Sequence, residues 1–378
     1  MKNNIKINLK KISKTLGYFS LGIFLILSIA IATLWFYSPG TAQLIMNSDG
    51  QEIENSISTI ETLVIGNTEQ SMIIRGVDKT KPVMLYLHGG PGSPEFSALT
   101  SRNKGLEENF VMVYWDQRGA GKSYSKDISI ETMNMKQFVS DTKKVSEFLI
   151  KKFNKDKIYI MGHSWGTLLG MMTVNKNPEL YHAYFGIGQN VSYQGEVVSL
   201  QWVRDQARLR GDREGVRELA ALTLPSKDDT FEVWFDYIPT QRAYVSKYGG
   251  TVYNSNVSMV DLVIELLLTK EYTITDKINY MKGIMFSFEN IGSELMNADL
   301  FNDINEIQTP VYVLHGKHDY NTPYQESKKF FDQLEASEKE FFTFENSAHS
   351  PIVEEVEKFN KIILEKVDKI ERNNNLIK

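Results

Sequence analysis

The chain has 378 residues, of which 42% are hydrophobic, 24% charged and 11% aromatic. This composition permits a large buried core and excludes a disordered or collagen-like protein. Cysteine is absent, which excludes disulfide frameworks, thiolate metal sites and cysteine nucleophiles. The net charge is −5, although residues 1–14 hold five lysines and no acidic residue. The rest of the chain is therefore acidic, and we expect no nucleic-acid partner.

The first predicted element is a membrane-spanning helix. Residues 15–37 contain no charged side chain, and a helix of this length measures roughly 34 Å, enough to cross a hydrocarbon core of about 30 Å. The basic tail, residues 1–14, is expected to stay in the cytoplasm, with the body outside the cell membrane. The alternative is a signal sequence cleaved near Gly40 and Ala42, which would release a secreted protein.

Residues 38–58 are predicted to form a linker, after which strands and helices alternate. Short runs rich in β-formers predict an opening antiparallel hairpin and four further strands, and helical periodicity predicts two helices between them. The expected strands are residues 62–65, 71–75, 83–87, 110–115, 157–161 and 184–188, and the expected helices are residues 132–152 and 165–175. This alternation is typical of βαβ units in an α/β protein with a mostly parallel sheet.

A helical insertion is expected to interrupt the sheet. Residues 190–300 are mostly helical in pattern and are predicted to form a lid over the carboxyl edge of the sheet. Its helices are expected at residues 197–210, 213–221, 231–247 and 259–269. The core would then comprise residues 59–189 and 301–371. Its second part is predicted to hold strands at residues 311–314 and 340–344 and helices at residues 324–334 and 352–370, before a frayed tail at residues 372–378.

The sequence Gly162-His163-Ser164-Trp165-Gly166 lies between a predicted strand and a predicted helix. A nucleophilic serine on such a sharp strand–turn–helix junction needs small residues two positions to either side, because the backbones pass closely there. Ser164 is therefore the predicted nucleophile.

The base and the acid are sought later in the chain, in the order serine, acid, histidine. His349 follows the last predicted strand, where a base is expected, and Asp319 follows the strand over residues 311–314. Asp319 would orient His349 and stabilise its protonated form. A metal site formed by His315, His318 and Asp319 is the alternative for this loop.

The negative charge that develops on a substrate oxygen requires two backbone N–H donors. Trp165, directly after the nucleophile, is expected to provide one. The second is expected from Gly90, in the glycine-rich loop after the strand over residues 83–87.

Taken together, the motifs of this chain resemble those of the proline iminopeptidase family. The resemblance covers about residues 60–190 and 305–370 and is carried by His88-Gly89-Gly90-Pro91-Gly92, Trp115-Asp116-Gln117-Arg118-Gly119-Ala120-Gly121-Lys122-Ser123, Gly162-His163-Ser164-Trp165-Gly166, Gly316-Lys317-His318-Asp319 and Ala348-His349-Ser350-Pro351. It implies an α/β-hydrolase fold with an inserted helical lid. It also implies that Asp116 and Arg118 are ion-pairing groups of the scaffold.

In prolyl-selective members of this family, acidic lid residues hold the free amino group of the substrate, one of them within a Trp-Glu pair. The nearest string here is Trp234-Phe235-Asp236, which does not match. Glu196 and Glu289 are the candidate amine ligands, and each is equally well interpreted as a solvated helix carboxylate.

The sequence thus predicts a membrane-anchored serine hydrolase that needs no metal or organic cofactor. By resemblance, its substrate is a short peptide with a free N-terminus, cleaved through an acyl-enzyme on Ser164. One alternative is a carboxylesterase or lipase-like hydrolase of small acyl esters with the same triad. The other is a non-catalytic binding protein. The expected partners are a small peptide or acyl substrate and the lipid bilayer around residues 15–37; the oligomeric state is left open.

Overall fold

The computed structural model describes residues 9–253 and 259–377. Its centre is an eight-stranded sheet in the order β1-β2-β4-β3-β5-β6-β8-β10. The strands are β1 (Ile57–Ile65), β2 (Thr68–Gly76), β3 (Val83–Leu87), β4 (Val111–Trp115), β5 (Ile158–His163), β6 (Tyr181–Ile187), β8 (Val311–Gly316) and β10 (Lys339–Phe344). β2 is antiparallel to β1 and to β4, and the other neighbouring pairs are parallel. The mostly parallel sheet expected from the sequence is confirmed.

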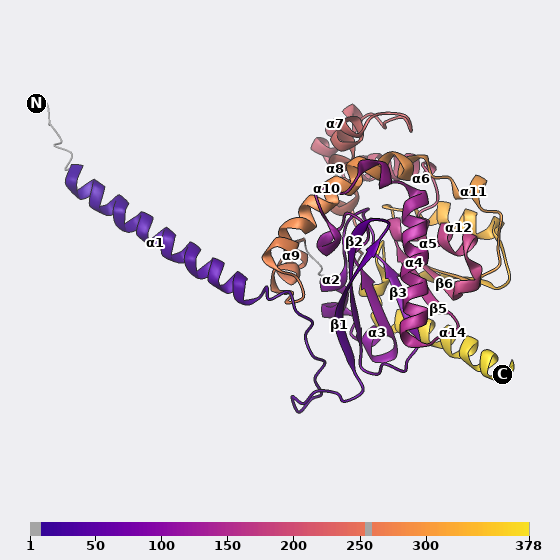
Figure 1. The fold of residues 1–378 in the computed structure, drawn as a ribbon. Helices are drawn as coiled ribbons and strands as arrows, with labels where there is room; N and C mark the ends of the chain where they lie inside the picture. The colour runs from indigo at the N-terminus through magenta and orange to yellow at the C-terminus, as the bar shows by residue number, and fades with distance from the viewer. Residues whose placement is uncertain (1–8, 254–258, 378) are drawn as a thin grey trace, which may run out of the picture.

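Helices cover both faces of this sheet, because its central strands are apolar on both sides (Figure 1). In β3, Val83, Leu85 and Leu87 belong to one buried cluster, whereas Met84 and Tyr86 belong to another. The first cluster also receives side chains from α4 (Met135–Phe153), α5 (Trp165–Lys176) and α12 (Tyr324–Gln333). The second receives them from α2 (Phe96–Arg102), α3 (Gly105–Asn109), α13 (Pro351–Glu354) and α14 (Val356–Ile377). Such alternation is what a strand buried between two layers requires.

A helical lid is inserted between β6 and β8, as expected. It contains α6 (Gln194–Leu209), α7 (Arg213–Ala221), α8 (Phe231–Lys247), α9 (Met259–Leu268) and α10 (Ile274–Asn297). The longest of these, α10, was not anticipated as one helix; its N-terminus carries a capping box formed by Thr273 and Asp276. Between the lid and β8, α11 (Leu300–Asp303) is followed by β7 (Glu306–Ile307), which pairs with β9 (Glu335–Ala336).

The N-terminal helix α1 (Leu9–Phe36) projects away from the body (Figure 1). Its segment Lys14–Phe36 has a mean hydropathy of 2.3, and none of that apolar window is buried. Length and composition suit a membrane span, and a signal sequence would pass the same criteria.

The expected linker, residues 38–58, contacts the body at several points. The Gly40 N–H donates to the Lys270 carbonyl, and Arg75 Nη1 donates to the Gln43 carbonyl. At the other end of the chain, α14 continues to Ile377, through the tail that was expected to fray. Arg372 Nε donates to the Asp368 carbonyl there, one of the contacts that extend the helix.

Candidate active site

Ser164 lies at the sharp turn between β5 and α5. Its backbone has φ +52° and ψ −118°, a left-handed conformation that a non-glycine residue adopts only under tertiary constraint. A side chain on Gly162 would meet the Gly166 carbonyl at 2.3 Å, and one on Gly166 would meet the Leu87 carbonyl at 2.1 Å. Both glycines are therefore required by backbone proximity, for the reason argued from the motif.

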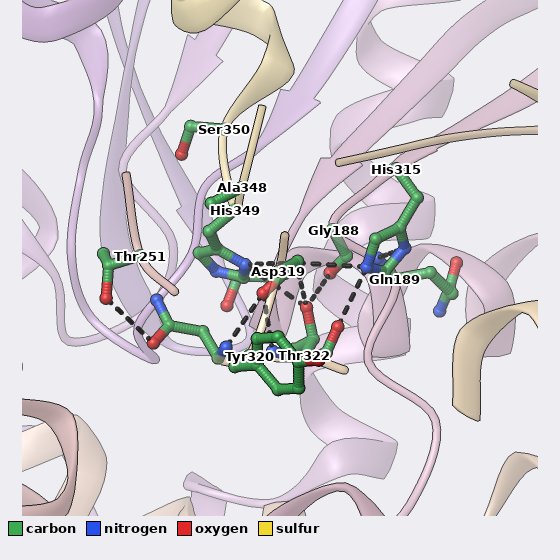
Figure 2. Close-up of polar contacts among 12 residues, drawn as sticks. Gly188, Gln189, Thr251, His315, Asp319, Tyr320, Thr322, Ala348, His349 and Ser350 are labelled. Carbon is green, nitrogen blue, oxygen red and sulfur yellow. Dashed lines mark hydrogen bonds and ion pairs between the residues drawn. The ribbon is translucent and has the colours of Figure 1, made fainter. Parts of the chain in front are cut away.

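Asp319 and His349 approach each other at the carboxyl edge of the sheet, from the loops after β8 and β10 (Figure 2). Asp319 Oδ2 lies 2.9 Å from His349 Nδ1. Burial opposes ionisation of Asp319, but the charges and hydrogen bonds of His349 and His315 hold the pKa of its carboxyl below the ordinary value. Burial lowers the pKa of His349, against the raising effect of Asp319. Nδ1 of His349 thus donates to a carboxylate, which leaves Nε2 as the basic nitrogen.

Asp319 is held by further partners that sequence reasoning missed. His315 Nε2 lies 3.1 Å from Asp319 Oδ2, and Thr322 Oγ1 lies 2.8 Å from it. The backbone N–H groups of Asn321 and Thr322 donate to the other oxygen at 2.8 and 3.0 Å. His315 Nδ1 accepts the Gln189 N–H, so its proton is on Nε2, facing Asp319. Figure 2 shows Asp319 between the two imidazoles. A carboxylate with this many donors is fixed in position and stays charged.

Gly90 and Trp165 both line a cavity whose lining also includes Ser164 and His349. Trp165 begins α5, where helix N–H groups lack intrahelical partners. Its indole Nε1 donates to Gln117 Oε1 at 2.9 Å, and Gln117 Nε2 donates to the His88 carbonyl at 3.1 Å. Gln117 therefore joins the two segments expected to supply the N–H donors, a role that the sequence did not disclose.

A second histidine–carboxylate pair lies beside the triad. His163 Nδ1 is 2.7 Å from Glu95 Oε1, and His163 Nε2 is 3.2 Å from the His349 carbonyl. Burial alone would lower the pKa of His163, but the charge and hydrogen bond of Glu95 outweigh burial and raise it. In its protonated form His163 donates from both nitrogens, one of them to the backbone carbonyl of His349. No signal in the sequence indicated this pair.

The cavity around these residues has a volume of about 220 Å³. Polar groups of Asn190, Ser192 and Asn321 lie beside an apolar wall in its lining. That wall consists of Ile238, Ile284, Phe288, Leu295 and Met296, all from the lid. A larger hollow of about 1100 Å³ lies among Lys155, His182 and Glu371, at the amino ends of the strands. Ligands of open α/β sheets bind at the carboxyl edge, so the smaller cavity is the candidate site.

The two candidate amine ligands occupy different positions. Glu196 is 8% exposed, lines the cavity and pairs with Arg242. Its Oε2 is buried and has no hydrogen-bond partner among the described residues. Glu289 is exposed on α10 and does not belong to the lining of this cavity.

Asp116 and Arg118 were both expected to form ion pairs in the scaffold, and only Arg118 does so. Arg118 Nε forms a fully buried ion pair with Asp141 Oδ2 at 2.8 Å. Asp116 instead accepts hydrogen bonds from the Tyr272 hydroxyl at 2.7 Å and the Lys122 N–H at 2.8 Å. Because burial outweighs these donors, the pKa of Asp116 is raised to about 7. It is a hydrogen-bonding group rather than one half of an ion pair.

The metal alternative finds no support in the described part of the chain, where no group of three or more His, Asp or Glu side chains could hold an ion. His318 turns away from Asp319: its ring stacks on Tyr253 at 3.5 Å, and its Nε2 lies 3.2 Å from the Glu345 carbonyl.

The sheet order, the inserted lid and the strained serine turn define an α/β-hydrolase. The model of the family described as serine aminopeptidase, S33, matches residues 80–226 and 290–356. The chain is 35% identical over 308 residues to the probable aminopeptidase YbaC of Bacillus subtilis, covering 80% of this chain and 94% of that protein. The chain belongs to the serine aminopeptidase family S33.

Two further comparisons agree with this assignment. A proline iminopeptidase of Heyndrickxia coagulans is 27% identical over 283 residues, covering 74% of this chain and 88% of that protein. The crystal structure of proline iminopeptidase from Mycobacterium smegmatis superposes with a TM-score of 0.60 at 16% identity, over 84% of this chain and 100% of that one. At this identity the structural likeness supports the fold. The predicted resemblance to proline iminopeptidases is confirmed.

Proposed function

We propose that this protein is a membrane-anchored serine hydrolase that removes the N-terminal residue of short peptides. The observation that carries the proposal is the meeting, in one cavity, of Ser164 on its strained turn with His349 on its buried carboxylate. Membership of the S33 family supports the peptidase class.

In the proposed reaction, the Ser164 hydroxyl attacks the carbonyl carbon of the first peptide bond while its proton passes to His349 Nε2. The N–H groups of Gly90 and Trp165 stabilise the oxyanion, each donor being worth about 3–4 kcal/mol. His349 then gives the proton to the departing amine, and the acyl group stays on Ser164. A water molecule, deprotonated by His349, releases the amino acid and restores the serine.

Glu196 is proposed to receive the α-ammonium group of the substrate. Its buried Oε2 lacks a partner among the described residues, although Arg242 pairs with the other oxygen. An unpaired buried carboxylate oxygen costs free energy, which an ammonium group in the adjoining cavity would recover by drawing that oxygen toward it. This arrangement favours substrates with a free N-terminus.

The second candidate is hydrolysis of small acyl esters by the same triad. The apolar lid side chains Ile284, Phe288 and Met296 in the cavity lining favour it, because they suit an acyl chain. A screen of purified protein against aminoacyl arylamides and short acyl esters separates the candidates. Release from aminoacyl arylamides supports the peptidase; turnover of esters alone supports the esterase. Failure of a fluorophosphonate probe to label folded protein would support a binding protein.

The anchor is part of the proposal. The uncharged stretch at residues 15–37 and the five lysines before it support one membrane crossing with the catalytic body outside. Protease added to intact cells should degrade the body, and N-terminal sequencing should find Met1 or Lys2. A mature N-terminus near Gln43 would show that the helix is a cleaved signal.

A further inference from the structure

Lid helix α9 turns an apolar stripe outward. Its exposed side chains recur at helical spacing along one face and are 40–66% exposed: Val260, Val263, Ile264, Leu267 and Leu268. On another side of the helix, Glu265 forms an ion pair with Arg102 of α2 at 2.7 Å, so α9 is attached to the body by a polar contact. An ordinary surface helix packs its apolar face inward, whereas α9 is apolar at all positions except Asp261 and Glu265 and leaves these five side chains exposed.

The neighbouring helix α10 extends this apolar surface. Ile278, Met281 and Met285 follow one another at intervals of three and four residues and are 51%, 61% and 43% exposed. Other residues of the same helix, Ile284 and Phe288, line the candidate cavity. Helix α10 therefore carries both part of the cavity lining and part of the exposed apolar surface.

A single lysine joins both helices to the end of α1. Lys277, at the start of α10, is 6% exposed. Its ammonium donates to the Leu267 carbonyl of α9 at 2.7 Å and to the Tyr37 carbonyl at 2.9 Å, and it lies 2.8 Å from Ser38 Oγ. Next to it, the Gly40 N–H donates to the Lys270 carbonyl at 2.9 Å. The end of α9 thus lies at the same level as the end of the apolar helix (Figure 1).

Aromatic residues at the end of α1 indicate its depth in a membrane. Trp35 and Phe36, at the last turn of α1, are 73% and 67% exposed, and Tyr37 follows them. Aromatic rings at the end of a membrane span lie in the headgroup region. A largely apolar helix held at this depth, with five apolar side chains turned outward, can bury them at the boundary between headgroups and acyl chains.

We propose that α9, with the exposed side chains of α10, lies in the headgroup boundary of the bilayer that α1 crosses, so that the lid is a second membrane contact. The proposal rests on the anchor proposed above. The partner that covers the exposed apolar side chains of α9 and α10 is the lipid bilayer, the same bilayer that surrounds α1. Through α10, the candidate cavity is then one helix away from the membrane.

The absence of cysteine allows a direct test on the full chain. Single cysteines at Val263→Cys, Met281→Cys, Ile26→Cys and Leu376→Cys would carry a nitroxide spin label in the protein reconstituted into lipid nanodiscs. Leu376 is an equally apolar control, 85% exposed at the C-terminal end, away from α1 (Figure 1). Collision with oxygen, which is soluble in lipid, is compared with collision with a water-soluble nickel chelate.

We expect labels at positions 26, 263 and 281 to collide mainly with oxygen and the label at position 376 mainly with nickel. Labels at positions 263 and 281 that behave like the one at 376, while position 26 reports lipid, would overturn the inference and leave the anchor intact. A water-exposed label at position 26 would overturn the anchor and the inference together. Spin–spin broadening at position 263, with shelter from both reagents, would indicate a second copy of the chain and reject the lipid contact.

Folding of each variant is checked by fluorophosphonate labelling at the wild-type rate. Where the Val263→Cys protein fails this check, Ile264→Cys takes its place, since that side chain is also exposed on the same stripe.

Discussion

The imidazole rings of His163 and His349 lie 4.8 Å apart, and each has its own carboxylate. Glu95 outweighs burial and raises the pKa of His163. For His349, burial is the largest influence and lowers the pKa, and the charge on His163 lowers it further. The pKa values of the two neighbouring rings are therefore displaced in opposite directions, that of His163 upward and that of His349 downward.

We predict that Glu95→Gln moves the acidic limb of kcat/KM to higher pH. Catalysis needs neutral His349, so activity falls as the pH drops through its pKa, which lies below 6.5 in the wild type. Without Glu95, the pKa of buried His163 falls, so its positive charge repels a proton on His349 less and the pKa of His349 rises. The measurement is a pH profile of kcat/KM. Glu340→Gln, on a surface carboxylate paired with Lys366, is the control that should leave the profile unchanged. An identical profile for Glu95→Gln would contradict the coupling.

Replacing the nucleophile should abolish turnover. In Ser164→Ala the attacking oxygen is lost, while Gly162 and Gly166 still permit the turn, so the protein should fold normally. The expected loss in kcat is on the order of 10⁶-fold. Circular dichroism and thermal unfolding serve as controls for the fold. Residual activity within about tenfold of wild type would reject the assignment.

The acid and the base should act as one unit. His349→Ala is expected to cost nearly as much as loss of the serine, and Asp319→Asn about 10⁴-fold in kcat, because an amide cannot hold the same tautomer of His349. The matched control is His318→Ala, since His318 stacks on Tyr253 away from Asp319. If His318→Ala reduced activity and His349→Ala did not, the assignment of His349 as the base would be wrong.

Glu196→Gln should separate the two candidate substrate classes. If Glu196 receives an α-ammonium group, the substitution removes a charge-assisted contact and raises KM for aminoacyl arylamides by about tenfold or more. The same variant should leave KM for uncharged acyl esters within about twofold. The control is Glu289→Gln, because Glu289 is exposed outside the cavity lining. Equal effects on both substrates would contradict the assigned role.

The segment after α1 should contribute to stability. A chain beginning at Trp35 retains the contacts of Tyr37 and Gln43 with the body, whereas one beginning at Ser48 loses them. Arg75 would then lack the Gln43 carbonyl, an acceptor worth about 1.5–3 kcal/mol to a charged donor. We expect the shorter chain to unfold at a temperature lower by several degrees, as measured by calorimetry. Equal unfolding temperatures for the two chains would show that this segment is only a linker and does not stabilise the body.

The sequence allowed the fold to be predicted because its signals are local. The central strands β3 and β4 are short apolar runs, and the serine turn is marked by Gly162 and Gly166 within five residues. These glycines are required by contacts with backbone that any strand–turn–helix junction of this kind would bring close.

The parts that the sequence did not predict depend on contacts between distant segments. Glu95 is 68 residues from His163, and Gln43 is 228 residues from Glu271, so no periodicity or motif reveals either pair. Both contacts exist only because the loops at the carboxyl edge and the lid are already assembled.

The position of the lid in the chain also determines when the enzyme becomes active. Tyr184 of β6 pairs with Val311 of β8, so the sheet closes only after the whole insertion has been made. Pairings of such high contact order form late in folding. A growing chain that already contains Ser164 still lacks Asp319 and His349. In the proposed mechanism, the serine therefore remains chemically inert during synthesis until the chain has reached residue 349, and a truncated product would carry a nucleophile that cannot act.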